Sequence, residues 1–159
     1  MATDWRLLSE RTAARSCAIT ARDYENGGAM MQPYPGPWQA PAEGLVIYDV
    51  LGKTGHASSG SEEVSLRRPL EHKLYQLSPV RNGWAAVGRT DKYLCGATVE
   101  IISCDEDELT IRLPEAGPFA VYSAKGAPRA ESVRFAEAGS GVYCAEMPIG
   151  PENIIALRR

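Results

Sequence analysis

Residues Glu108-Leu-Thr-Ile-Arg-Leu113 alternate between apolar and polar side chains without a break. Successive side chains of an extended strand point to opposite faces, so the leucines and the isoleucine would share one face, with Thr110 and Arg112 on the other. A strand candidate at residues 98–104 lies before this segment, and the acidic turn Asp105-Glu-Asp107 separates the two. This pattern predicts an antiparallel hairpin with one face buried and one face in water.

Similar short segments recur along most of the chain. From residue 45 they follow one another about every 8–12 residues, separated mainly by glycine or proline, which is typical of a sandwich or barrel. Residues 53–60 read as a flexible turn. The sequence therefore predicts an all-β fold, an antiparallel two-layer β-sandwich that is Greek-key-like, with an N-terminal arm and a Pro-rich loop. The predicted strands span residues 45–50, 63–66, 70–79, 84–87, 98–104, 108–113, 119–123, 132–135, 141–146 and 153–157.

The first 42 residues read differently from the rest. Residues 5–15 favour a short helix, and the alternation within residues 16–21 indicates a strand. Four prolines lie within residues 33–41, and because proline lacks an N–H donor and restricts its neighbour, this stretch predicts an extended loop. We therefore divide the chain into residues 1–42, a strand and Pro-rich loop packed on the sandwich, and residues 43–159, the β-sandwich domain.

Charge and hydropathy argue against two classes of partner. The formal net charge is −3, and no basic stripe is present to bind a nucleic-acid backbone. No apolar run approaches the roughly 20 residues needed to cross a bilayer. The N-terminal segment lacks the apolar core of a secretory signal. We expect no nucleic-acid partner, no membrane association and a cytoplasmic location.

The four cysteines are scattered, with no Cys-x-x-Cys pair, and the chain has only two histidines. This arrangement lacks the ligand spacing of a zinc site and predicts reduced, partly buried thiols, while a disulfide between Cys95 and Cys104 stays open. No Walker motif and no strand–glycine–helix unit for a dinucleotide is present. The sequence therefore predicts no metal and no cofactor.

Several short motifs follow one another along the chain, and their order can be compared with that in known families. They are Leu45-Val-Ile-Tyr-Asp-Val50, residues 70–81 with the ending Ser-Pro-Val-Arg, and residues 84–94 with Val-Gly-Arg-Thr-Asp-Lys-Tyr. A strand-like segment at residues 97–103 follows, and Glu25-Asn-Gly-Gly-Ala-Met30 precedes them. Residues 45–128 resemble the C-terminal β-domain of glycoside hydrolases of the raffinose synthase and alkaline α-galactosidase type, and residues 25–30 more faintly resemble the turn that opens this domain.

This resemblance implies a non-catalytic accessory β-sandwich with a structural or partner-docking role. In that family the catalytic aspartates lie in a barrel that has no counterpart here, and Asp49 and Asp91 match β-domain motifs only. The partners that the resemblance implies are a glycoside hydrolase catalytic domain or a second copy of the chain. We expect no enzymatic activity, although a small hydrolase stays open as an alternative.

The second functional hypothesis is a carbohydrate-binding module that recognises galactosides through loop aromatics. The chain has three tryptophans and seven tyrosines, and an aromatic ring suits the apolar face of a sugar. Tyr34 and Trp38 lie in the proline-rich loop, which would lose little entropy on binding, and Trp5 is a further candidate. The competing interpretation is that aromatics such as Trp84 and Tyr48 simply fill the core of the sandwich.

Overall fold

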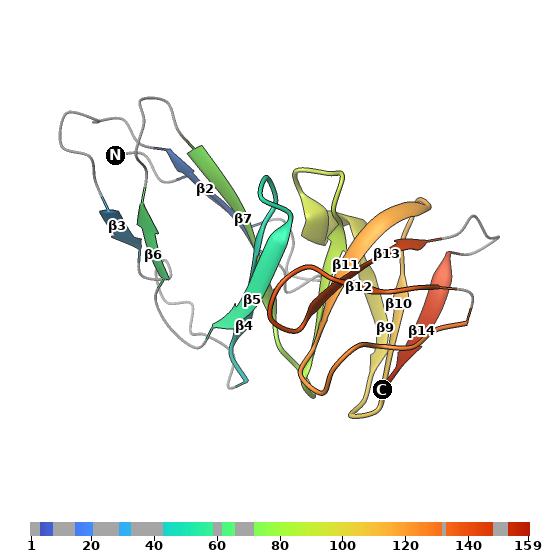
Figure 1. The fold of residues 1–159 in the computed structure, drawn as a ribbon. Coiled ribbons are helices and arrows are strands. Elements are labelled where there is room, and N and C mark those ends of the chain that lie inside the picture. Colours follow the sequence, from blue (N-terminus) through green and yellow to red (C-terminus); the bar gives the residue numbers. More distant parts are fainter. Residues whose placement is uncertain are drawn as a thin grey trace.

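The computed structural model describes the backbone of residues 4–7, 15–20, 29–32, 43–58, 62–65, 72–131, 133–147 and 153–159, and the side chains of 43–58, 72–131, 133–147 and 153–159. These residues form an almost entirely β structure (Figure 1), in which one short 3-10 helix, η1 (Cys95–Thr98), interrupts the strands. The strands are β1 (Asp4–Leu7), β2 (Arg15–Thr20), β3 (Ala29–Gln32), β4 (Leu45–Asp49), β5 (Thr54–Ser58), β6 (Glu62–Ser65), β7 (His72–Pro79), β8 (Trp84–Arg89), β9 (Glu100–Cys104), β10 (Glu108–Arg112), β11 (Gly117–Ser123), β12 (Ala136–Glu137), β13 (Val142–Met147) and β14 (Ile154–Arg158).

The strands pair antiparallel throughout the described residues. The N-terminal sheet has the order β1-β2-β7-β4-β5, the middle sheet β12-β13-β11-β8 and the C-terminal sheet β14-β10-β9, while β3 pairs with β6. The chain crosses from the middle to the C-terminal sheet between β8 and β9, returns between β10 and β11, and crosses again between β13 and β14. The predicted all-β sandwich is confirmed.

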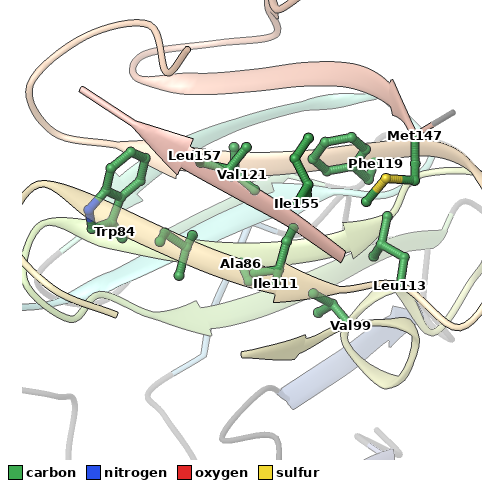
Figure 2. Packing of buried hydrophobic residues seen from close by; sticks show 11 residues of the cluster. Trp84, Ala86, Val99, Ile111, Leu113, Phe119, Val121, Met147, Ile155 and Leu157 are labelled. Atoms are coloured by element: carbon green, nitrogen blue, oxygen red, sulfur yellow. The ribbon is translucent and has the colours of Figure 1, made fainter. Parts of the chain in front are cut away.

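The sandwich core lies between the middle and C-terminal sheets. Leu109 and Ile111 of β10 point inward and are fully buried, as the alternation in the sequence predicts. Figure 2 shows how side chains from β14 and from the middle sheet, among them Phe119 and Ile155, close around this interior. The buried cluster consists of Trp84, Ala86, Val99, Leu109, Ile111, Leu113, Phe119, Val121, Met147, Ile155 and Leu157.

A second apolar cluster covers the other face of the middle sheet and includes side chains of β4. In β8, Trp84 and Ala86 enter the sandwich core, whereas Ala85 and Val87 belong to this second cluster. A strand that is covered on both faces reads as a continuous apolar run, which explains why this stretch shows no alternation. The N-terminal sheet thus adds a further layer to the predicted sandwich. The second cluster consists of Val46, Tyr48, Val50, Val80, Ala85, Val87, Cys95, Ala120 and Val142.

Three local predictions differ from the structure. The predicted helix over residues 5–15 is wrong in its described part, because Asp4–Leu7 forms β1 and pairs with β2. Instead of a strand at residues 132–135, an isolated bridge joins Ala130 to Val133. Where the sequence indicates a turn, β5 forms, and Gly55 in it donates its N–H to the Ala138 carbonyl at 3.0 Å. Tertiary pairing therefore overrides the weak strand propensity of glycine.

Gly88 allows η1 to pack directly on β8. Its φ is +96°, and a Cβ at this position would lie 2.0 Å from the carbonyl oxygen of Cys95. The register between β8 and β11 also shifts here, since Ala120 pairs with Gly88 while Val121 pairs with Ala86. Because η1 belongs to the crossing into the C-terminal sheet, this crossing requires glycine in β8.

We predict that Gly88→Ala lowers the free energy of unfolding by at least about 3 kcal/mol, because it combines backbone strain with a clash against the Cys95 carbonyl. Gly126→Ala is the matched control: its φ is +105°, but nothing lies within 4 Å of the added Cβ. That variant should lose only about 1–2 kcal/mol. Urea unfolding at neutral pH measures both, and equal losses would mean that the close approach at Gly88 is unimportant.

Candidate binding site

A hollow of about 530 Å³ opens at one end of the sandwich. Its wall comes from the last residue of β8, the connection through η1, and the turn between β10 and β11. These segments meet because β8 and β11 are antiparallel neighbours, with Arg89 paired to Phe119. The residues that line the hollow are Arg89, Lys92, Tyr93, Leu94, Ala97, Thr98, Pro114 and Glu115.

Two apolar side chains in the wall of the hollow are unusually open to solvent. Tyr93 is 71% exposed and Leu94 is 44% exposed, although both are large. Neither residue belongs to either apolar cluster. A concave surface that presents an aromatic ring with a few polar groups nearby is the usual form of a small-molecule site. Tyr93 is therefore placed to receive the flat apolar face of a ligand.

A buried arginine fixes the polar side of the hollow. The Arg89 guanidinium donates from Nε to Asp91 Oδ1 at 2.8 Å and from Nη2 to Asp91 Oδ2 at 2.5 Å. Its Nη1 donates to the Ala116 carbonyl at 2.5 Å and to Glu115 Oε2 at 3.3 Å. Such a bidentate arrangement holds both partners in one geometry. Asp91 and Glu115 are thus oriented before any ligand arrives.

The Arg89 side chain has little freedom to move away. Only 8% of its side-chain surface is exposed. Gly117 lies against it so closely that a Cβ there would come within 2.7 Å of the guanidinium carbon. The φ of Gly117 is +137°, which also favours glycine. The absence of a side chain at Gly117 therefore leaves room for the guanidinium at the start of β11.

The charges around the hollow balance one another. The hydrogen bonds from Arg89 hold the pKa of Asp91 below its ordinary value of 3.8, and its positive charge acts in the same direction. Glu115 also pairs with the Lys92 ammonium, with Nζ and Oε2 3.3 Å apart. Near neutral pH the four side chains carry two positive and two negative charges. A polar ligand without net charge suits such a surface better than an anion or a cation.

The aromatic residues singled out in the sequence do not form this site. Tyr34 and Trp38 lie outside the described residues, and Trp5 lies in β1, whose side chains are also outside them. Trp84 and Tyr48 are buried in the two clusters. Sequence reasoning did not single out Tyr93. The sequence did contain one indication of Tyr93. It is an aromatic residue in a connection rich in charged residues, and this connection follows a strand that contains a glycine.

Asp49, the other aspartate in the family-like motifs, has a structural role. Its Oδ1 accepts hydrogen bonds from the backbone N–H groups of Leu51, at 3.0 Å, and Gly52, at 2.8 Å. This is the aspartate turn that commonly closes a tight connection between strands. Asp49 thus shapes the link between β4 and β5.

The described thiols are not activated nucleophiles. Burial raises the pKa of the Cys95 thiol to about 11, and burial also raises the pKa values of Cys104 and Cys144. Cys95 and Cys104 are free, and each sulfur faces a backbone carbonyl, that of Lys92 and that of Arg81 respectively. The disulfide left open in the sequence is therefore not formed in this structure.

The described residues contain no group of three or more histidine, cysteine, aspartate or glutamate side chains arranged to hold a metal ion. Within the same ranges, no helix has the length and apolar character needed to span a membrane. Comparison with known proteins finds no protein-family model and no curated protein that matches the chain.

We predict that Asp91→Asn alters how stability depends on pH. Because the folded-state pKa of Asp91 is lowered, its contribution is fully present above the unfolded value and is lost as the pH falls through the folded value. The unfolding free energies of the native chain and the variant should differ most at neutral pH and converge below about pH 4. Urea unfolding across a pH series tests this.

The control for that experiment is Asp105→Asn, in the exposed turn between β9 and β10. Asp105 forms no ion pair among the described residues, so its substitution should leave the acid limb of the stability curve close to that of the native chain. A constant offset for Asp91→Asn at every pH would contradict the assigned role of the Arg89 pair.

Proposed function

We propose that this chain is a non-catalytic binding domain that holds a neutral carbohydrate against Tyr93. The observation that carries the proposal is the exposed Tyr93 ring at a hollow whose polar groups are fixed and balanced in charge. A pyranose has one face of C–H groups and a rim of hydroxyls, so it needs an aromatic surface and nearby hydrogen-bonding groups.

The polar groups at the hollow retain capacity for ligand hydroxyls. A carboxylate offers about four acceptor positions. The Asp91 carboxylate accepts two hydrogen bonds from Arg89, and so has positions left. The Lys92 ammonium has three donors, of which the Glu115 ion pair occupies one. The Asp91 carboxylate can therefore accept a hydrogen bond from a sugar hydroxyl, and the Lys92 ammonium can donate one to it.

The same groups support binding without hydrolysis. A glycosidase needs one carboxyl group that stays protonated near neutral pH to act as general acid. Asp91 has the opposite tendency, since Arg89 lowers its pKa. The sequence resemblance to an accessory domain of α-galactosidase-like enzymes points in the same direction, and residues 84–94 of that resemblance include Tyr93. Galactosides are accordingly the first sugars to test.

We expect raffinose, melibiose and methyl galactoside to give saturation-transfer NMR signals, with calorimetric affinities on the order of millimolar. Tyr93→Ala should abolish binding because it removes the aromatic face, while Tyr93→Phe should retain most of it. Leu51→Ala is the matched control, because Leu51 is also an exposed apolar residue but does not line the hollow. Binding that survives in Tyr93→Ala, or that is equally lost in Leu51→Ala, would refute the proposed site.

A second candidate function is the structural or docking role, with a second copy of the chain as partner. It is favoured by Ile101 and Ile102, which are exposed on β9, the edge strand of the C-terminal sheet. Open apolar edges invite pairing with another chain. Glu100 is the one charged residue of β9, so antiparallel pairing of two copies need not bring like charges together.

For this candidate we predict a concentration-dependent dimer in light scattering coupled to size exclusion. Ile102→Lys should shift the protein to monomer, because a lysine on an edge strand opposes strand addition. Thr110→Lys places the same charge on β10, an inner strand of the same sheet, and should leave association unchanged. A native protein that stays monomeric at high concentration would rule the candidate out.

A further inference from the structure

We infer that the outer edge of β14 is a binding site for a short acidic peptide, which adds to the C-terminal sheet as an antiparallel strand. A second hollow, of about 680 Å³, runs beside this edge. It lies between β14 and the segment from Arg129 to Glu131 on the opposite wall. This site is separate from the hollow at Tyr93, and the inference does not depend on the carbohydrate proposal.

The backbone of β14 is arranged to accept a further strand. On one side β14 pairs with β10 along its whole length. On the other side Arg158 exchanges two backbone hydrogen bonds with Arg129, with N–O distances of 2.7 and 2.8 Å. Outward-pointing backbone groups recur at every second residue, so Ala156 and Ile154 point theirs to the same side as Arg158. Among the described residues, no strand pairs with Ala156 or Ile154 on this outer side.

The side chains around the edge favour negative charge. The hollow is lined by Arg129, Arg158 and Arg159, and Glu131 is the one acidic side chain in its wall. Arg158 is paired with Glu108, with Nε and Oε2 2.7 Å apart. No salt bridge of Arg129 occurs among the described residues. Charge complementarity therefore selects an acidic partner over a neutral or basic one.

The register specifies where the acidic residue would lie. Glu108, Arg158 and Arg129 are directly opposite one another, so their side chains share the outer face of the sheet. In an antiparallel strand added beside β14, a residue opposite Ala156 would lie diagonally next to this row. The residue two positions later would lie opposite Ile154, which is 43% exposed. The expected peptide therefore has the pattern acidic–any–apolar, in that order along its chain.

The sequence of β14 does not carry the usual protection of an edge. Proteins blunt exposed edges with proline, inward-pointing charges or bulges. The stretch Ile154-Ile-Ala-Leu157 has none of these features, and the pairing of β14 with β10 is regular over its five positions. Among the described residues, only the Arg129 pairing at Arg158 covers this edge, so Ile154 and Ala156 are available for strand addition.

The probe for the test is a peptide with blocked ends, Glu-Val-Ile-Val-Thr, labelled with fluorescein at its C-terminal end. With its glutamate opposite Ala156, this peptide begins beyond the position that Arg129 occupies beside Arg158. Fluorescence anisotropy should show binding that weakens with added salt, and about tenfold weaker binding when lysine replaces the glutamate. Arg129→Glu should reverse this preference between the two peptides. Arg134→Glu, an exposed arginine that does not line the hollow, should leave both affinities unchanged.

Backbone pairing between the peptide and β14 has its own readout in the native chain. Peptide binding should shift the amide NMR signals of Ile154 and Ala156 and protect those amides from exchange. A peptide methylated on the backbone nitrogen of its glutamate should bind at least about tenfold more weakly, because a donor to the ladder is lost. Absence of these amide shifts, equal binding of the methylated peptide, or equal weakening by Arg134→Glu would each overturn the inference, whatever the outcome of the sugar experiments.

Discussion

Within the middle sheet, β8 is buried on both faces, and this constraint organises the rest of the structure. Trp84 and Ala86 of β8 pack into the sandwich core, while Ala85 and Val87 pack toward β4. These four positions are therefore fixed by apolar contacts, and a polar residue at any of them would bury an unpaired group. The N-terminal and C-terminal sheets are held by the same strand. A change in β8 is transmitted to both clusters.

The candidate site is a direct continuation of this buried strand. Arg89 is the last residue of β8, and its pairing with Phe119 ties it to β11. Its guanidinium reaches Asp91 and the Ala116 carbonyl, which belong to the two connections that border the hollow. A site whose polar groups are fixed by a core strand loses little conformational freedom on binding. Tyr93, by contrast, lies on the connection between two sheets and is exposed.

The sequence predicts a strand correctly when one face of that strand is exposed to solvent and the other is buried. The alternation around Ile111 identifies β10 correctly, because its inner residues are buried and Arg112 is exposed. It cannot reveal that β8 is covered twice, since a continuous apolar run also fits a single buried layer. It misses β5, whose Gly55 and His56 favour turns, because pairing with β4 decides that segment.

The site was harder to predict than the fold. Its residues come from segments far apart in the chain, and Glu115 approaches Arg89 only because β8 and β11 are paired. Tyr93 is exposed to solvent whereas Trp84 is buried, and the residue type alone does not predict this difference. The motif Val-Gly-Arg-Thr-Asp-Lys-Tyr contains five residues that the fold or the site uses, although none of them indicates a function by its type alone. They are Gly88, Arg89, Asp91, Lys92 and Tyr93.

The position of Cys95 makes its thiol a natural reporter of local opening. Its thiol is buried under the connection that bears Tyr93, and it donates to the carbonyl of Lys92 at 3.0 Å. A thiol with so high a pKa, shielded from solvent, reacts with an alkylating reagent chiefly when the surrounding segment opens. The rate at which Cys95 acquires an alkyl mass tag therefore reports how often that segment lifts from β8, without any engineered label.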